Sequence, residues 1–258
     1  MSRFFSTLIC LFFVLLPQTF AQEQEYEPSP PKRSMQAKLG GALGFTQNWL
    51  FLDVDPINQI LRSNGAAELD KRGVPLFGGQ GYGYVLFVQN LRIGGMGASG
   101  TLKSKSLRGV TRRDVELKVG FGGVTVDYVI PIVPRLDVAL GGLFGGGGLD
   151  IKMTRDNGSP KVWDNLWNEY GNNGPTNTSA PFEYSRKLSG SFFIYQPSVN
   201  VEFALLRWLG FRTGVSYLGM AGGEWELDGK YELIGVPSSI NGKGLMLNGG
   251  IFVGTFIF

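Results

Sequence analysis

Over most of the chain, apolar and polar residues alternate with a period of two. The clearest run is 193–205, FIYQPSVNVEFAL, in which one side takes apolar or aromatic residues and the other takes polar ones such as Gln196 and Glu202. The segment 209–217 repeats this alternation. Because successive side chains of a β-strand point to opposite faces, the pattern predicts strands with one apolar and one mostly polar face.

Eight segments carry this signal, and they predict eight strands: 37–47, 78–89, 91–104, 114–130, 136–153, 184–205, 209–227 and 243–258. Within 115–130 the apolar parity shifts across Gly122-Gly123, which predicts a β-bulge. Helical periodicity is confined to 56–63 and 161–170. The glycines of 91–104 make the strand count least certain there, so ten strands remain an alternative to eight.

The connections between these segments alternate between long and short: 48–77, 89–91, 105–113, 131–135, 154–183, 206–208 and 228–242. In an up-and-down meander, this alternation gathers every long loop at one end and both chain termini at the other. Such segregation is typical of membrane barrels, which have long outer loops and short periplasmic turns. We therefore expect an all-β fold: a closed, antiparallel, up-and-down transmembrane β-barrel whose two longest loops are extracellular and carry short helices.

Composition agrees with a membrane barrel and excludes several kinds of site. Charged residues make up 17% of the chain, below the roughly 25% of an ordinary soluble domain. The absence of histidine excludes a Ser-His-Asp triad and a histidine zinc site, and a single cysteine, Cys10, excludes an internal disulfide. A net charge of +3 gives no reason to expect a nucleic-acid partner. We expect no metal, no cofactor and no enzymatic activity.

The first 36 residues precede the alternating pattern. Arg3, an apolar run over 4–16 and the small-x-small site Thr19-Phe20-Ala21 predict a signal peptide at residues 1–21. Residues 22–36 are polar and proline-rich, so we expect a flexible periplasmic lead-in before a barrel at 37–258.

The chain ends in MLNGGIFVGTFIF, with Phe252, Phe256 and Phe258 on one face of the last strand. This resembles the terminal strand of bacterial outer-membrane β-barrel proteins, and the chain as a whole resembles their small eight-stranded class of OmpA-, OmpX- and OmpW-like barrels. The resemblance implies the bacterial outer membrane as location. It also implies outer-membrane lipid, lipopolysaccharide and the barrel-assembly machinery as partners, with these three phenylalanines as the assembly signal. The opposite face of the strand, with Ile251 and Val253, is apolar as well.

Strand parity assigns eight charged residues to the barrel interior: Lys38, Arg92, Glu116, Lys118, Asp127, Asp137, Glu202 and Arg212. Four are basic and four are acidic, and an unpaired charge in a narrow lumen is costly. The pattern favours a lumen plugged by paired charges, although an ion path or a catalytic carboxylate pair stays open. Outside, we expect an apolar belt about 25 Å tall with aromatic girdles. Trp208, Phe256 and Phe258 would mark its periplasmic edge, and Tyr82, Tyr84, Phe193 and Tyr217 its outer edge.

Two loop segments carry apolar stripes at helical spacing. One comprises Ile57, Ile60 and Leu61, in a helix that Asp55 would cap, and the other comprises Trp163, Leu166, Trp167 and Tyr170. The stripes either pack locally on the barrel rim or form a contact site for an unknown surface ligand.

These observations favour an outer-membrane barrel with a structural or surface-interaction role, in adhesion or in the cell envelope. The alternative is a porin-like narrow transporter or a binding protein for small apolar solutes, which apolar interior residues such as Met96, Leu143 and Met220 would favour. An outer-membrane lipid-modifying enzyme is less favoured because it would need a base other than histidine. A secreted soluble barrel that binds a ligand in its mouth explains neither Phe258 nor the one-sided loops.

Overall fold

The computed structural model describes residues 40–109, 111–156, 163 and 183–256. The expected signal peptide and lead-in, as well as Lys38 and Phe258, lie outside this part of the chain. Within it, no helix is long and apolar enough to cross a membrane.

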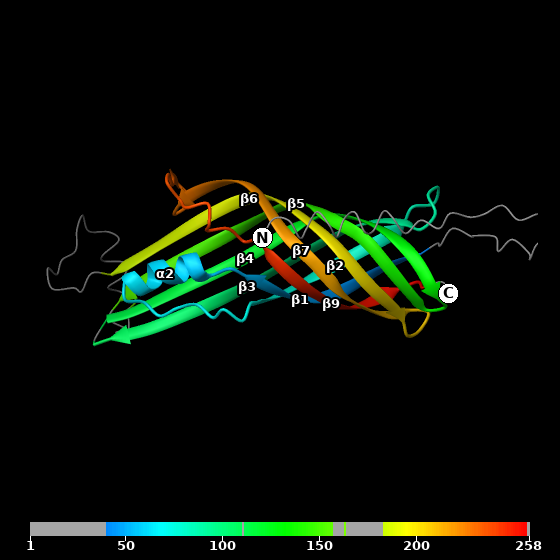
Figure 1. Ribbon diagram of the computed structural model, residues 1–258, viewed down its shortest axis with the longest axis horizontal. Helices are drawn as coiled ribbons and strands as arrows, with labels where there is room; N and C mark the ends of the chain where they lie inside the picture. The colour runs from blue at the N-terminus through cyan, green and yellow to red at the C-terminus, as the bar shows by residue number, and fades with distance from the viewer. Residues whose placement is uncertain (1–39, 110, 157–162, 164–182, 257–258) are drawn as a thin grey trace, which may run out of the picture. The chain divides into compact units, whose positions relative to one another are not determined.

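Eight antiparallel strands form a closed hydrogen-bonded ring (Figure 1). They are β1 (Gly41–Leu52), β2 (Val74–Tyr84), β3 (Leu91–Arg108), β4 (Thr111–Val133), β5 (Leu136–Asp156), β6 (Tyr184–Ala204), β7 (Leu209–Leu227) and β9 (Gly244–Gly254). Sequential neighbours pair from β1 to β7, and β9 closes the ring by pairing with both β7 and β1. A two-residue strand, β8 (Tyr231–Glu232), adds to the end of β7. The eight-strand antiparallel ring predicted from the sequence is confirmed, and the ten-strand alternative is not.

The ring has two distinct ends. The terminal end holds the start of β1, the end of β9 and the short turns 85–90, 134–135 and 205–208. The loop end holds 53–73, with helix α2 (Asp55–Ser63), the last residues of β3 and β5, and the segment 228–243 that follows β7. Helix α2 matches the helix expected at 56–63, except that Val54 rather than Asp55 occupies the N-cap position.

Two predicted connections are wrong because hydrogen-bonded ladders continue through them. The expected long loop 105–113 is a tight hairpin, in which Gly109 turns at φ +58° and Arg108 pairs with Thr111. The strand expected at 78–89 runs from Val74 to Tyr84, because its ladder with β1 extends to the pair Leu50 and Val74. A strand's ends are set by where its neighbours stop pairing, and that information is not local in the sequence.

Apolar residues change faces halfway along the long strands. On β4, Val115, Leu117 and Val119 are buried inside near the loop end, whereas Val124 and Val126 are exposed outside near the terminal end. The β4 ladder runs without interruption through this region, so the bulge predicted at Gly122-Gly123 is absent. The parity is constant along the strand, and what inverts is the residue type on each face.

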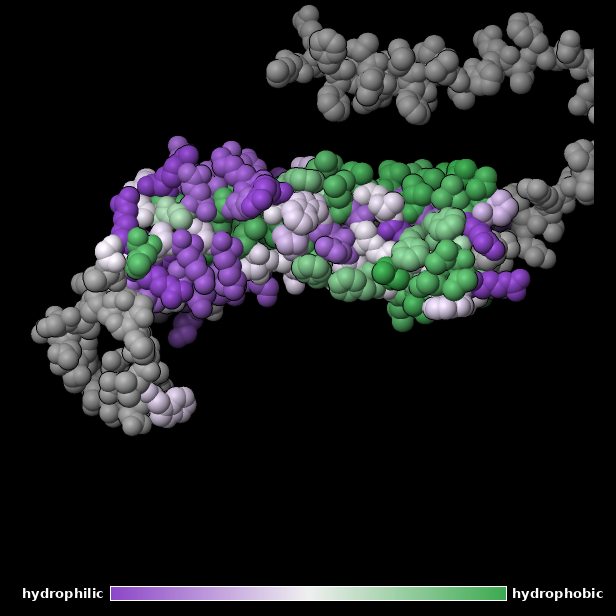
Figure 2. All heavy atoms as spheres, turned by 90° about the horizontal axis from the view of Figure 1, so that it is seen from below, coloured by the Kyte–Doolittle hydropathy of each residue, from purple (hydrophilic) through white to green (hydrophobic). Residues whose placement is uncertain are grey.

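The outer surface of the terminal half therefore forms an apolar belt. Figure 2 shows hydrophobic residues gathered toward the end where β9 finishes, and hydrophilic residues toward the loop end. The belt includes Leu43, Phe45, Val124, Val126, Tyr128, Val199, Val201, Phe203, Phe211, Val215, Ile251 and Val253, all of which are exposed.

The interior has the opposite order. Its loop half is an apolar core that includes Leu50, Leu76, Leu117, Leu149, Ile194 and Met246, and α2 adds Ile57 and Leu61 to this core. Its terminal half holds the polar and charged side chains described below. Leu143 and Met220 are packed within the core, each 2% exposed, and Met96 packs against it.

Several aromatic residues face the other way from the prediction. Phe252 is 2% exposed and faces the interior, where Phe256 packs against it, whereas Ile251 and Val253 face outward. Both faces of this strand are apolar, so alternation alone did not determine its orientation. Tyr82 and Tyr84 lie inside at the terminal end and not on the outer edge of the belt. Trp208 is exposed in the turn 205–208, and Phe193 and Tyr217 face outward, as predicted.

Candidate functional site

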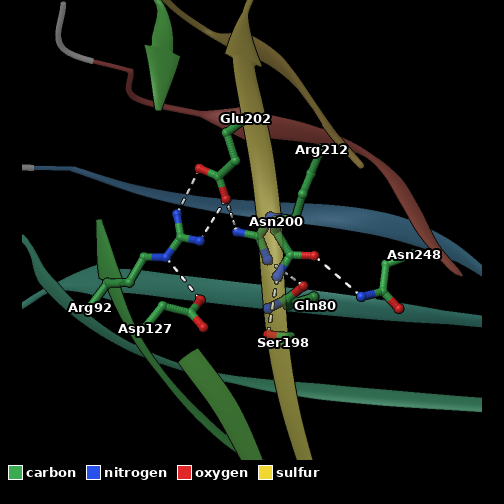
Figure 3. Close-up of polar contacts among 8 residues, drawn as sticks. All are labelled: Gln80, Arg92, Asp127, Ser198, Asn200, Glu202, Arg212 and Asn248. Atoms are coloured by element: carbon green, nitrogen blue, oxygen red, sulfur yellow. Dashed lines mark hydrogen bonds and ion pairs between the residues drawn. The ribbon is translucent and has the colours of Figure 1, made fainter. Parts of the chain in front are cut away.

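Four charged residues from four strands meet inside the terminal half of the ring: Arg92 of β3, Asp127 of β4, Glu202 of β6 and Arg212 of β7 (Figure 3). The Nη1 and Nη2 groups of Arg92 donate to Glu202 Oε2 at 2.7 Å and to Oε1 at 2.6 Å. Its Nε donates to Asp127 Oδ2 at 3.0 Å. Arg212 contacts the same Glu202 Oε1 through its Nη2. We call these four residues the interior cluster.

The ring positions the interior cluster as two facing pairs. Arg92 and Asp127 are direct partners in the β3–β4 ladder, and Glu202 and Arg212 are direct partners in the β6–β7 ladder. The Arg92–Glu202 contact joins the two pairs across the interior. Two guanidinium groups and two carboxylates sum to zero charge, which buried ions require if they are not to be left uncompensated.

Aromatic rings lie against the two guanidinium groups. The Tyr82 ring centroid is 4.1 Å from Arg92 Cζ and 5.1 Å from Arg212 Cζ, and the Phe252 centroid is 4.5 Å from Arg212 Cζ. A cation over the face of an aromatic ring is stabilised electrostatically, the more so where water is excluded. Phe252 fits because Gly44 opposite it has no side chain, and a Cβ at that position would collide with the ring.

Two sets of side-chain hydrogen bonds lie beside the interior cluster, one made by Arg212 and one among residues of β6, β7 and β9. Arg212 Nη1 donates to Gln80 Oε1 at 2.6 Å. Further bonds run from Gln196 Nε2 to Ser216 Oγ, from Ser216 Oγ to Asn248 Oδ1, from Asn248 Nδ2 to Asn200 Oδ1 and from Asn200 Nδ2 to Ser198 Oγ, all between 3.0 and 3.2 Å. These bonds tie β6, β7 and β9 together inside the ring.

A small polar cavity of about 20 Å³ lies beside this network. It is lined in part by Thr46, Asn48, Thr125 and Gln196, each of which has a buried polar side-chain atom without a partner among the described residues. Such a volume is sufficient for about one water molecule, and a buried water needs two to four polar partners. The cavity therefore suits an internal water.

Half of the charges assigned to the interior by parity form the interior cluster. Asp137 shares the interior face and pairs in register with Glu202 at the terminal end, where it is half-buried. Glu116 and Lys118 are on the outer surface, contrary to the prediction, and Glu116 there pairs with Lys103 at 3.3 Å. The prediction failed because it assumed that the apolar face is the outer face along the whole of β4.

Sequence reasoning missed Gln80, Tyr82 and Phe252. For the first two a signal existed, since Gln80 and Tyr82 alternate with glycines on β2 and share its interior face. For Phe252 there was none, because both faces of β9 are apolar. Among the described residues, no group of three or more acidic, histidine or cysteine side chains could hold a metal ion.

The first loop stripe is mostly a plug and not a contact surface. Ile57 and Leu61 are each 6% exposed within the core, whereas Ile60 is 46% exposed. Asn58 anchors the loop, because its Nδ2 donates to Leu69 O at 3.0 Å and its Oδ1 accepts from Leu69 N at 2.7 Å. In the second stripe, Trp163 is 70% exposed, and Leu166, Trp167 and Tyr170 lie outside the described residues.

The chain matches no protein-family model and no curated protein. It is structurally similar to solved outer-membrane proteins. With Ail, the attachment invasion locus protein of Yersinia pestis, solved in complex with the heparin analogue sucrose octasulfate, it shares 12% identity at a TM-score of 0.41, over 84% of this chain and 99% of that one. It shares 9% identity with a major outer membrane protein from Thermus thermophilus, at a TM-score of 0.39, over 83% of this chain and 98% of that one. It shares 9% identity with the outer membrane protease OmpT from Escherichia coli, at a TM-score of 0.32, over 84% of this chain and 96% of that one.

Proposed function

We propose that the chain is a bacterial outer-membrane β-barrel with a closed lumen, whose role is structural or surface-interacting. The observation that carries the proposal is the inversion of faces along single strands. The terminal half is apolar outside and polar inside, and the loop half is apolar inside and charged outside. A ring that passes from lipid into water requires this arrangement.

Strand lengths support the same reading. A strand crosses the hydrocarbon core with about 9–11 residues, whereas β4, β5 and β6 have 23, 21 and 21. On β6 the outward residues from Phe193 to Phe203 are apolar or aromatic, and those further on toward the loop end are Ser191, Ser189 and Lys187. The belt thus has the length of one crossing, and the remaining strand would stand in water beyond the membrane.

The interior supports a closed lumen more than a transporter. The terminal half is bridged by the interior cluster and the loop half is filled by the apolar core. The small polar cavity has room for about one water molecule and is too small for an apolar solute. We place the surface interaction on the parts of the loop end that are exposed, such as Ile60 and Trp163.

The test uses arginine substitutions on one face of β6. Val199→Arg, in the middle of the belt, should lower the free energy of unfolding in lipid by about 2–4 kcal/mol, the cost of a cation near the bilayer midplane. Ser189→Arg, on the same outward face in the loop half, is the matched control and should cost under about 0.5 kcal/mol, as surface changes do. The free energy of unfolding is measured by urea unfolding in lipid vesicles, and heat-modifiable migration of the protein in outer-membrane fractions shows that each variant folds.

Two results would contradict the proposal. One is recovery of the folded wild-type protein in the soluble periplasmic fraction. The other is an equal cost for Val199→Arg and Ser189→Arg, because a soluble ring would expose both positions to water.

A further inference from the structure

Three neighbouring strands interrupt the apolar belt at the same register. On each strand five side-chain positions face outward. The central position is not apolar, and the two positions on each side of it carry apolar or aromatic residues. The sets are Leu43, Phe45, Gln47, Trp49 and Phe51 on β1; Val253, Ile251, Gly249, Leu247 and Leu245 on β9; and Leu209, Phe211, Thr213, Val215 and Tyr217 on β7. The central residues Gln47, Gly249 and Thr213 are direct ladder partners. We call these three residues the belt row.

Within the belt row, the side-chain amide of Gln47 is the polar group that lacks a hydrogen-bond partner among the described residues. Its side chain is exposed and makes no hydrogen bond to any described residue, whereas Thr213 Oγ1 donates to Asn248 O at 3.2 Å. The apolar residues on β1 extend four positions from Gln47 in each direction, to Leu43 and Phe51, which is about 13 Å along the strand. Lipid headgroups therefore do not reach Gln47, and hydrocarbon offers an amide no partner.

The belt row is also the floor of a hollow in the outer wall. The hollow has a volume of about 590 Å³, and its rim includes Phe45, Trp49, Phe211, Leu247 and Ile251. Gly249 leaves the middle of the floor without a side chain. An acyl chain could fill such a space, but it would leave the amide of Gln47 unpaired.

We propose that a second copy of this chain packs against this hollow in the membrane and hydrogen-bonds to Gln47. This inference rests on the proposed membrane location. Two barrels inserted with the same orientation are related by a two-fold axis along the membrane normal, and such an axis brings the same patch of each copy together. An amide suits this symmetry because it carries both donors and an acceptor, so it can pair with its own copy. Gly249 lets the two walls approach closely.

Disulfide cross-linking in outer membranes tests the contact. In a Cys10→Ser background, Gly249→Cys places a thiol in the belt row, where a Cβ meets only an ordinary contact of 3.5 Å with Gln47 O. Val126→Cys, on the outer face of β4 across the ring, is the control. After oxidation, Gly249→Cys should give a disulfide-linked dimer at about ten times the yield of Val126→Cys, a difference equivalent to about 1.4 kcal/mol.

A second variant identifies the amide as the cause. Adding Gln47→Leu to Gly249→Cys should reduce dimer yield about tenfold, because a lost hydrogen bond in the membrane is worth up to roughly 1–2 kcal/mol. The barrel should still fold, since the change makes the belt uniformly apolar. An undiminished dimer yield would overturn the role of Gln47.

The remaining outcomes separate the two proposals. Three results with folded, membrane-embedded Gly249→Cys protein would overturn the dimer but not the membrane location. The protein forms no dimer, it is linked to another membrane protein instead, or it forms a dimer in no greater yield than Val126→Cys. Protein that fractionates as soluble overturns the proposed membrane location, and heat-modifiable migration reports folding independently of either result.

Discussion

Arg92 and Glu202 form a bidentate ion pair across the interior of the ring, although 110 residues separate them in the sequence. The two lie on β3 and β6, with β4 and β5 between them along the wall. Arg92 has no exposed surface and the Glu202 side chain is 10% exposed. The pair therefore links opposite sides of the ring where water is largely excluded.

Removing the Glu202 charge should destabilise the barrel strongly. Glu202→Gln leaves Arg92 and Arg212 with Asp127 as the one carboxylate of the interior cluster, and breaking a buried pair costs about 3–5 kcal/mol. We expect a loss of about 3 kcal/mol, measured by urea unfolding in lipid vesicles.

Glu116→Gln is the matched control for this substitution. Glu116 pairs with Lys103 on the outer surface, where the two side chains are 40% and 60% exposed. Exposed pairs contribute about 0–1 kcal/mol, so the loss should be under about 1 kcal/mol. Equal losses for the two variants would show that the interior cluster does not hold the ring together.

The purified protein should not conduct ions steadily in a planar bilayer. The interior cluster blocks the terminal half, and side chains such as Leu117, Leu149 and Ile194 fill the loop half. Because the two barriers are in series, Glu202→Gln should not open a path either. A large, steady conductance of the wild-type protein would refute the closed lumen and favour the transporter alternative.

Helix α2 should stabilise the barrel through one of its faces only. Leu61→Ala removes a side chain buried in the core and should cost about 2–4 kcal/mol, as leucine truncations in cores do. Ile60→Ala, one residue earlier and 46% exposed, should cost under about 1 kcal/mol. If unfolding measurements show the two variants to be equally stable, α2 does not plug the ring.

The hairpin at the end of β7 should loosen in acid. The backbone N–H of Lys187 and the guanidinium of Arg186 hold the pKa of Asp228 below its ordinary value of 3.8. A carboxyl group with a lowered pKa contributes stability above its unfolded pKa and loses it as the pH falls through the folded pKa. The contacts of Asp228 should therefore persist at neutral pH and weaken only below pH 3.8.

An NMR titration of the Asp228 carboxyl checks this expectation. Its midpoint should lie below 3.8, and Arg186→Gln should raise it by removing the second of the two partners. A midpoint at or above 3.8 in the wild-type protein would show that these contacts are absent.

Alternation in the sequence was sufficient to predict which face of a strand points inward wherever one face is apolar and the other is polar. On β6 and β7, the polar faces with Asn200, Glu202 and Arg212 were assigned to the interior, and the structure buries them there. The number of strands, the antiparallel ring and helix α2 also followed from local patterns. Period and turn spacing are properties of short segments, so they can be read without knowledge of the fold.

Only the tertiary structure decided which face of a strand points inward in two cases. One is a strand whose two faces are both apolar, and the other is a strand that passes from an apolar into an aqueous environment. Phe252 faces inward because Tyr82 and Arg212 meet it there, and these come from two other strands. Glu116 faces outward because β4 keeps its parity while its surroundings change from apolar to aqueous. The pairing of Arg92 with Glu202 was likewise absent from the sequence, because a contact across the interior depends on how all eight strands close into a ring.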